Sequence, residues 1–252
     1  MMRLATLSPG LPEIFLAPQG EGPSAGESCV FVRLSQCNLH CIWCDTPYTW
    51  NFTGTDFQHR DDRLDAPAKF DRAIETIDVD LDELVADLTS RPCRRLVLTG
   101  GEPLLQQRAL GALCTRLKTV DLRWVIEIET NGTLAPKGDV LAWVDQFNVS
   151  PKLHHSGNPL ALRRKDSILA DYARDPRAVF KFVVQCSRDL DEINDIVGAV
   201  QMPAQRVWLM PEGTDSKTLC ARMGWIREAC AAYGYQASDR LQIHAHGDTR
   251  GT

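Results

Sequence analysis

The chain has 252 residues, of which 44% are hydrophobic and 24% charged, and its formal net charge is −5 at pH 7. Its interspersed charges argue against a nucleic acid or a membrane surface as the main partner, and no run approaches the roughly 18 apolar residues of a membrane span. Because residues 1–15 also lack the apolar core of a signal peptide, we expect a cytosolic protein.

Strand-like and helix-like segments alternate along most of the chain. Short β-branched or apolar runs predict strands at residues 28–34, 94–100, 124–130, 147–150, 178–184, 206–210 and 241–245. Apolar residues at helical spacing predict helices at residues 81–88, 104–117, 190–200 and 217–234. Asp80 is the expected N-cap of the first helix, with Glu83 completing a capping box, and Gly234 is the expected end of the last. This order predicts a parallel sheet with right-handed crossovers.

The same elements predict an α/β fold of the barrel kind. Six or seven strands without the GxGxxG pattern of a nucleotide-binding first strand favour a partial or modified (β/α) barrel over a Rossmann sheet. We expect residues 1–252 to form a single domain. Within it, the polar and charged residues 50–79 predict an insertion or loop, with a short helix near residues 69–76.

Polar or glycine-rich residues follow nearly every predicted strand. They lie at residues 37–46, 99–103, 129–133, 150–152, 211–213 and 244–246. Each group taken singly is ordinary turn chemistry. Together, however, they would lie at the carboxyl ends of parallel strands, and in α/β barrels that face carries the active site. We therefore expect these groups to form one site.

Three of the nine cysteines stand close together in CNLHCIWCDT, residues 37–46: Cys37, Cys41 and Cys44. In a reducing cytosol, such a group is more often metal-binding or catalytic than disulfide-bonded. A zinc ion would need a fourth ligand, for which His40 and His59 are candidates, and a redox pair would use Cys41 and Cys44. The remaining cysteines stand singly, and we expect small buried hydrophobic residues at Cys29, Cys93, Cys114, Cys186, Cys220 and Cys230.

An iron–sulfur cluster accounts for a group of three rather than four cysteines. A [4Fe–4S] cluster normally takes four thiolates, so three leave one iron open, and an open coordination position allows a metal centre to do chemistry. Trp43, directly before the last cysteine, is placed to shield such a cluster or to pack on a cofactor. The motif therefore favours a catalytic cluster, with zinc as the alternative.

The CxxxCxxC motif after the first predicted strand, with GGEP at residues 100–103, resembles the radical S-adenosylmethionine (SAM) enzymes. A narrower resemblance links the chain to the 7-carboxy-7-deazaguanine synthases (QueE), an enzyme family of this superfamily. It rests on residues 18–46, which contain QGEG as the most discriminating feature, and on residues 99–103, 129–133, 150–152 and 241–251. The resemblance covers nearly the whole chain and is weakest at residues 50–79.

This resemblance implies roles for the matching residues. Cys37, Cys41 and Cys44 bind the [4Fe–4S] cluster, and Thr46 binds a Mg2+ ion that also touches the substrate. The residues implied in substrate binding are Pro18, Gln19, Gly20, Glu21, Arg33, Thr99, Gln242 and His244. Those implied in SAM binding are Trp43, Gly101, Glu129, Ser150, Pro151 and Lys152. The family usually has leucine where Pro18 stands, so the backbone contact there is expected to differ.

The resemblance also implies the reaction and the partners. In the superfamily, one electron from the cluster cleaves SAM to a 5′-deoxyadenosyl radical, so no side chain is expected to be the catalytic group. The family contracts the ring of 6-carboxy-5,6,7,8-tetrahydropterin to 7-carboxy-7-deazaguanine with loss of ammonia, in the queuosine pathway of tRNA modification. Such a carbon–nitrogen lyase regenerates SAM. It takes electrons from a flavodoxin or ferredoxin and is typically a homodimer.

Two rival functions remain at this point: a radical SAM enzyme that activates a glycyl-radical protein, and a non-catalytic zinc-stabilised module. The first would need a large protein-docking surface rather than a pocket containing QGEG and Arg33. Three further residues are expected to lie outside the site: His154 and His155 on a surface loop, and Lys181 on a strand face.

Overall fold

The computed structural model describes residues 1–62 and 69–252. Its strands are β1 (Met2–Ser8), β2 (Leu11–Pro12), β3 (Ile14–Pro18), β4 (Ser28–Leu34), β5 (Thr76–Val79), β6 (Arg95–Gly100), β7 (Val125–Thr130), β8 (Gln146–Val149), β9 (Ala178–Val184), β10 (Val207–Pro211) and β11 (Gln236–Ala237). Its helices are α1 (Arg72–Glu75), α2 (Leu81–Ser90), α3 (Gln107–Val120), α4 (Gly138–Trp143), α5 (Leu160–Arg163), α6 (Asp166–Arg174), α7 (Asp189–Val200), α8 (Ser216–Tyr233) and α9 (Leu241–His246).

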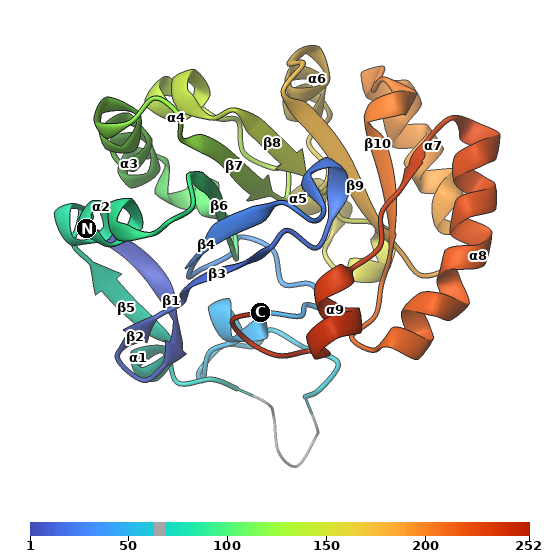
Figure 1. The fold of residues 1–252 in the computed structure, drawn as a ribbon. Coiled ribbons are helices and arrows are strands. Elements are labelled where there is room, and N and C mark those ends of the chain that lie inside the picture. The colour runs from blue at the N-terminus through green and yellow to red at the C-terminus, as the bar shows by residue number, and fades with distance from the viewer. Residues whose placement is uncertain (63–68) are drawn as a thin grey trace.

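The strands form one mixed sheet across the described residues, in the order β11-β10-β9-β8-β7-β6-β4-β1-β2, with β3 on β4 and β5 on β1. From β4 to β11 every neighbouring pair is parallel, whereas β1 and β3 pair with β4 in the antiparallel sense. The sheet curves without closing (Figure 1). The expected partial α/β barrel is therefore confirmed.

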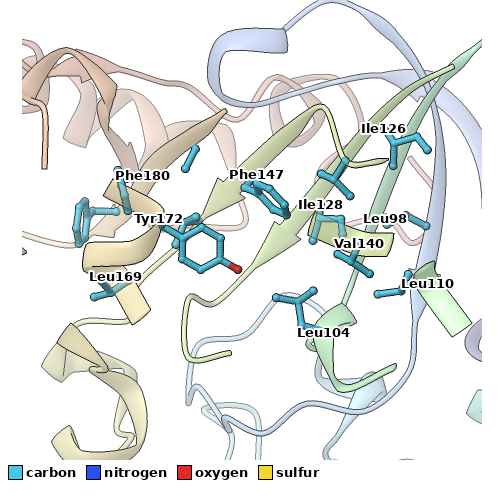
Figure 2. Close-up of a cluster of buried hydrophobic side chains, with 14 of the residues drawn as sticks. Leu98, Leu104, Leu110, Ile126, Ile128, Val140, Phe147, Leu169, Tyr172 and Phe180 are labelled. Carbon is cyan, nitrogen blue, oxygen red and sulfur yellow. The ribbon is translucent and has the colours of Figure 1, made fainter. Parts of the chain in front are cut away.

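One face of the curved sheet packs against helices. Figure 1 shows α2, α3, α4, α6, α7 and α8 along the outer side of the parallel strands. Figure 2 shows the apolar layer between them, in which the rings of Phe147 and Tyr172 meet edge to face at 5.6 Å. The helix ends agree with their predicted caps, because the Asp80 carboxylate accepts from the Asp82 amide and Gly234 adopts the left-handed conformation after α8.

The other face of the parallel strands is unusually polar. Side chains alternate along a strand, so neighbours of the core residues point to the concave side. Arg33 of β4, Glu129 of β7, Asn148 of β8 and Lys181 of β9 are among these inward residues, and Lys181 is only 2% exposed. Barrel interiors are normally filled by branched apolar side chains. A charged interior here marks a place for a polar ligand.

Residues 241–245 form helix α9 rather than the predicted strand. A five-residue run of alternating apolar and polar residues fits either element, and here long-range contacts decide. The Leu241 amide donates to the Gly20 carbonyl at 3.1 Å, while Ile243 is buried. The last parallel strand is instead β11, which pairs with β10 through Gln236 and Ala237.

The predicted insertion at residues 50–79 is corrected in part. Its last four residues form β5, which pairs with β1 from Met2–Val79 to Ala5–Thr76. The short helix expected near residues 69–76 is present as α1, and residues 63–68 of the predicted loop lie outside the described residues. The amino-terminal strands β1 and β3 were not predicted at all.

The cysteines outside the motif do not all behave as buried hydrophobic residues. Cys29, Cys114 and Cys230 are buried as expected, but Cys186 and Cys220 are exposed. Cys220 lies on helix α8 and Cys186 follows strand β9, where neither position faces the core.

In the described part of the chain, no helix combines the length and apolarity that crossing a membrane requires.

Candidate active site

The concave side of the sheet encloses a cavity of about 520 Å³. Its walls come from the carboxyl ends of the parallel strands, the turn after β3, the cysteine segment, and the chain from Arg240 to Thr252. A volume of this size suits a small-molecule ligand or cofactor. Five of the six polar groups that were predicted to follow strands contribute residues to this cavity, whereas residues 244–246, at the end of helix α9, do not.

Nearly all of the predicted site residues line this cavity. They are Pro18, Gln19, Gly20, Glu21, Arg33, Cys37, Cys41, Trp43, Cys44, Thr46, Thr99, Gly101, Glu129, Ser150, Lys152 and Gln242. Pro151 is buried beside the cavity between Ser150 and Lys152 but does not line it. His244 also lies outside it, where its ring nitrogens contact Ser216 Oγ at 2.5 Å and Asp239 Oδ1 at 2.9 Å.

The cysteine segment has little helix or strand of its own, so hydrogen bonds to other segments fix its course. Asn38 donates to Thr133 Oγ1 at 2.8 Å and accepts from Asn131 at 2.8 Å, beyond the end of β7. Asn158 accepts from the His40 amide at 2.8 Å. The motif is thereby tied to the chain beyond β7 and to the chain beyond β8.

The three cysteines suit a [4Fe–4S] cluster. Each sulfur lines the cavity and has a donor nearby: the Leu39 amide for Cys37, Asn158 Nδ2 at 3.3 Å for Cys41, and the Thr46 hydroxyl for Cys44. Donors to sulfur are a usual feature around such clusters. Burial raises the pKa of the Cys41 thiol to about 12, so a thiolate here needs the charge of bound iron.

Neither histidine that was considered as a fourth zinc ligand is placed for that role. His59 Nε2 is 2.8 Å from the Cys44 carbonyl oxygen, and the His40 ring stacks on Phe57 with centroids 3.4 Å apart. The described residues contain no group of three His, Cys, Asp or Glu side chains arranged to hold a single metal ion. A cluster binds each cysteine to a different iron, so its ligands do not have to meet at one point.

The GGEP segment holds the cysteine loop in place. A Cβ on Gly101 would lie 2.0 Å from the Gln36 carbonyl oxygen, just before Cys37. Glu102 is fully buried and accepts from the Thr130 hydroxyl at 2.9 Å and the Asn131 amide at 2.7 Å. Gly101 was predicted to let a ligand approach the backbone. In the structure its close neighbour is the backbone of the cysteine loop, although it also lines the cavity.

One wall of the cavity carries a buried group of charges. Lys181 Nζ lies 2.5 Å from Glu129 Oε2 and 3.1 Å from Glu21 Oε2, while Gln242 and Arg240 bind Glu21 Oε1 at 2.8 and 3.2 Å. Burial by itself raises the pKa of Glu21, but Lys181 and Arg240 outweigh it and hold that pKa at about 2. Burial and the neighbouring carboxylates of Glu21 and Glu127 raise the pKa of Glu129, although Lys181 acts to lower it. Lys181 was expected on a strand face, and it lies on the inner face of β9, where it lines the cavity.

Arg33 enters the cavity beside its strand neighbour Thr99. Its Nε donates to Glu13 Oε1 at 2.7 Å, and the Tyr48 hydroxyl donates to Glu13 Oε2 at 2.9 Å. Burial lowers the pKa of Arg33, but Tyr48 and Glu13 outweigh it, so the guanidinium stays charged. The structure thus presents a fixed cation whose partners lie on its Nε side.

Several cavity residues were missed by the sequence analysis. They are Asp45, Tyr48, Lys181, Arg240 and Asp248. A signal existed for Lys181, since a single charge inside the apolar strand AVFKFVV must have a buried partner. Asp45 and Arg240 are close in sequence to predicted residues, but the contact between them joins positions 195 residues apart. No local pattern reports such a contact.

Comparison with known proteins places the chain in a family. A family model for a 4Fe-4S single cluster domain matches residues 19–168. The 7-carboxy-7-deazaguanine synthase of Pyrobaculum aerophilum is 34% identical, over 95% of each chain. That of Rhodopirellula baltica is 32% identical, over 95% of this chain and 87% of the relative. The chain belongs to the 7-carboxy-7-deazaguanine synthase family.

Fold comparison agrees with this membership. The crystal structure of QueE from Escherichia coli has a TM-score of 0.67 and 24% sequence identity, covering 95% of this chain and 94% of the other. At that identity the likeness shows the fold. The 7-carboxy-7-deazaguanine synthases are radical SAM lyases with a [4Fe–4S] cluster that act on a small molecule, so these parts of the predicted resemblance are confirmed.

The residues around Trp43 show one further correction for this family member. His154 is exposed as expected, but the His155 side chain is only 8% exposed. The His155 ring lies 5.5 Å from the Trp43 ring, and its Nε2 is 3.2 Å from the Val183 carbonyl oxygen. Lys152 Nζ lies 5.8 Å from the centre of the same indole. Trp43 therefore has both His155 and Lys152 as neighbours at the edge of the cavity.

Proposed function

We propose that this chain is a 7-carboxy-7-deazaguanine synthase, which contracts 6-carboxy-5,6,7,8-tetrahydropterin to 7-carboxy-7-deazaguanine with loss of ammonia. The product serves the 7-deazapurine, or queuosine, pathway of tRNA modification. One observation carries the proposal: the three cysteines and the residues Gln19, Arg33 and Thr99 line the same cavity. Family membership at 34% identity over nearly the full length supports it.

The cofactor sites follow from the cavity wall. Cys37, Cys41 and Cys44 hold the cluster, which supplies the electron that cleaves SAM when both are bound. We assign SAM binding to Trp43, Gly101, Glu129, Ser150, Pro151 and Lys152. Lys152 Nζ donates to Ser150 Oγ at 2.8 Å, which holds this cation at the edge of the cavity as a partner for a carboxylate. Pro151 acts only by fixing the backbone between them.

The substrate site lies on the other wall. We assign the carboxylate of the substrate to Arg33, whose planar guanidinium is suited to a two-point contact and is already oriented by Glu13. Gln19 and Glu21 supply amide and carboxylate groups for the polar edge of the pterin. A Cβ on Gly20 would lie 1.8 Å from Gln242 Oε1, so any other residue here would displace the Gln242 side chain. Pro18 and Thr99 complete the assignment, and His244, which lies outside the cavity, acts through its contacts with Ser216 and Asp239.

We assign a magnesium ion to Thr46. Thr46 lines the cavity with its hydroxyl 3.6 Å from Cys44 Sγ, and a hydroxyl oxygen suits a hard cation that keeps waters and substrate oxygens as its other ligands.

We also propose a single domain over residues 1–252, a cytosolic location, a homodimer, and a flavodoxin or ferredoxin as electron donor. The homodimer and the electron donor follow from the sequence resemblance, and the single domain and the cytosolic location are the expectations of the sequence analysis.

Anaerobic turnover tests the proposed function. The chain is reconstituted with iron and sulfide and incubated with carboxytetrahydropterin, SAM, Mg2+ and a reductant, and products are identified by mass spectrometry. We expect a brown protein with about four irons per chain and formation of 7-carboxy-7-deazaguanine. Cys44→Ala should lose both. A colourless protein with one zinc would contradict the proposed iron–sulfur cluster. SAM cleavage without product would contradict the proposed synthase reaction but not radical SAM chemistry.

A further inference from the structure

Arg240 connects three segments that build the cavity. It is 7% exposed and lies directly before α9. Its Nε is 3.2 Å from Glu21 Oε1 in the QGEG turn, its Nη1 donates to the Gly213 carbonyl at 2.7 Å beyond β10, and its Nη2 donates to Asp45 Oδ2 beside Cys44. Each nitrogen therefore serves a different segment.

The chemistry of arginine makes this contact rigid. A guanidinium is planar, permanently charged and directs its donors in fixed directions, so three partners bound to one guanidinium cannot shift independently. A lysine ammonium is a flexible point charge and would not impose the same relation. Arg240 thus fixes the relative positions of Glu21 and Asp45.

Charge neutralisation alone does not explain Arg240. Glu21 would keep Lys181 at 3.1 Å and Gln242 at 2.8 Å if Arg240 were lost. Asp45, in contrast, has Arg240 as its recorded ion-pair partner among the described residues. The contact therefore matters most for the segment that contains Cys44 and Thr46.

We propose that Arg240 is a positioning residue that holds the cysteine loop in register with the substrate-binding turn. This inference rests on the proposed function. Hydrogen abstraction requires the reacting atoms to be held within a narrow range, and a misplacement of about 1 Å costs on the order of 100-fold in rate. Without the link through Arg240, SAM would still be bound and cleaved, but the substrate would not stand where the hydrogen is removed.

The test compares Arg240→Gln, Arg240→Lys and Asp45→Asn with the wild type. Arg206→Lys is the matched control, because Arg206 also binds segments together, through the carbonyls of Ala173, Asp175 and Ala178, but lies outside the cavity. Iron content, product and 5′-deoxyadenosine are measured in the same anaerobic reactions. Hydrogen exchange of residues 19–22 and 37–46 provides a readout that does not depend on activity.

We expect Arg240→Gln to keep its iron, to lose on the order of 100-fold in product formation, and to release 5′-deoxyadenosine without product. Amide hydrogen exchange in Arg240→Gln should become faster in residues 19–22 and 37–46 but not in β8 and β9. Asp45→Asn should show the same changes. Because the two changes break the same link, the double variant should be little worse than either single one. Arg206→Lys should keep the wild-type ratio of product to 5′-deoxyadenosine.

Two results would overturn the proposal. One is an unchanged ratio of product to 5′-deoxyadenosine in Arg240→Gln and Asp45→Asn. The other is a parallel loss of iron, product and exchange protection throughout the chain, which would make Arg240 a general stabilising residue. If Arg240→Gln does not fold, Asp45→Asn decides, since Asp45 is partly exposed. A wild type that makes no product would instead count against the proposed function.

Discussion

Lys181 and Glu129 form an ion pair inside the curved sheet, with 2.5 Å between the ammonium nitrogen and Oε2. The two residues come from β9 and β7, which flank β8, and Lys181 also reaches Glu21. A charged pair in this position replaces the apolar filling of an ordinary barrel. Buried charged side chains therefore form this wall of the cavity, and removing one of them should change both stability and turnover.

Lys181→Met should destabilise the cluster-free protein by about 3–5 kcal/mol, because it leaves the buried Glu129 carboxylate without its counter-charge and leaves Glu21 with Arg240 alone. Chemical denaturation measures this loss. Lys118→Met is the matched control, since Lys118 is also buried and pairs with Asp145 outside the cavity. Both variants should lose stability, but only Lys181→Met should lose turnover. Full stability in Lys181→Met would show that the pair contributes nothing.

Gly101→Ala should lose most of its bound iron. The added Cβ would lie 2.0 Å from the Gln36 carbonyl oxygen and 2.9 Å from the Cys37 amide nitrogen, so the cysteine loop must move. Gly198→Ala in α7 is the control, because its Cβ meets open space. That variant should keep its iron and gain about 0.5–1 kcal/mol of stability from helix propensity. Iron content is measured after reconstitution. Equal iron in both variants would contradict the proposal that the GGEP segment holds the cysteine loop in place.

Thr46→Ala should raise the Mg2+ concentration needed for half-maximal activity by on the order of tenfold, with iron content unchanged. Thr46→Ser keeps the hydroxyl and should behave as wild type. Thr119→Ala, on the outer helix α3, should change neither property. A magnesium titration of turnover measures the effect. Loss of iron in Thr46→Ala would mean that the hydroxyl supports the cluster loop rather than a metal ion.

The stability that Glu21 provides should depend on pH. Its folded pKa of about 2 lies below the ordinary value of 4.5, so its contribution is full above about pH 5 and is lost as the pH falls through about 2. The shift corresponds to about 2 kcal/mol once partial solvent screening is allowed for. Glu129, whose pKa is raised, acts in the opposite direction.

The contribution of Glu21 is therefore isolated as the difference in unfolding free energy between the cluster-free wild type and Glu21→Gln. This difference should shrink between pH 6 and pH 2.5. A difference that stays constant over the same range would show that Glu21 does not titrate with the lowered pKa.

The outer helices α2, α3, α7 and α8 and the parallel strands β4 and β6 to β10 could be predicted because their signals are local, whereas α4, α6 and β11 were not predicted. The run SCVFVRL is a strand wherever it folds, and Asp80 and Gly234 mark helix ends by their own backbone chemistry. Strand β1 has a weaker local signal, since Thr6 is the one β-branched residue in MRLATLS, and its pairing with β5 joins positions some 70 residues apart. Helix α9 likewise depends on a contact with Gly20 at the other end of the sequence.

The residues of the candidate site also fall into those with a local sequence signal and those whose role depends on long-range contacts. Its cysteines and QGEG turn form contiguous motifs, and resemblance to known enzymes identifies them. Arg240 and Lys181 have roles only because the fold brings Glu21 to both of them across 219 and 160 residues. Sequence patterns therefore located the chemistry of the cofactor, while the charges that hold the cavity together required the structure.

The yield of 7-carboxy-7-deazaguanine per SAM consumed, measured by mass spectrometry under anaerobic conditions, tests the central claim most directly. If the cysteines and the Arg33 pocket form one catalytic site, the reconstituted chain should convert carboxytetrahydropterin and make more product than the SAM it consumes, because SAM is regenerated. Absence of product from a chain that carries an intact cluster would contradict the account.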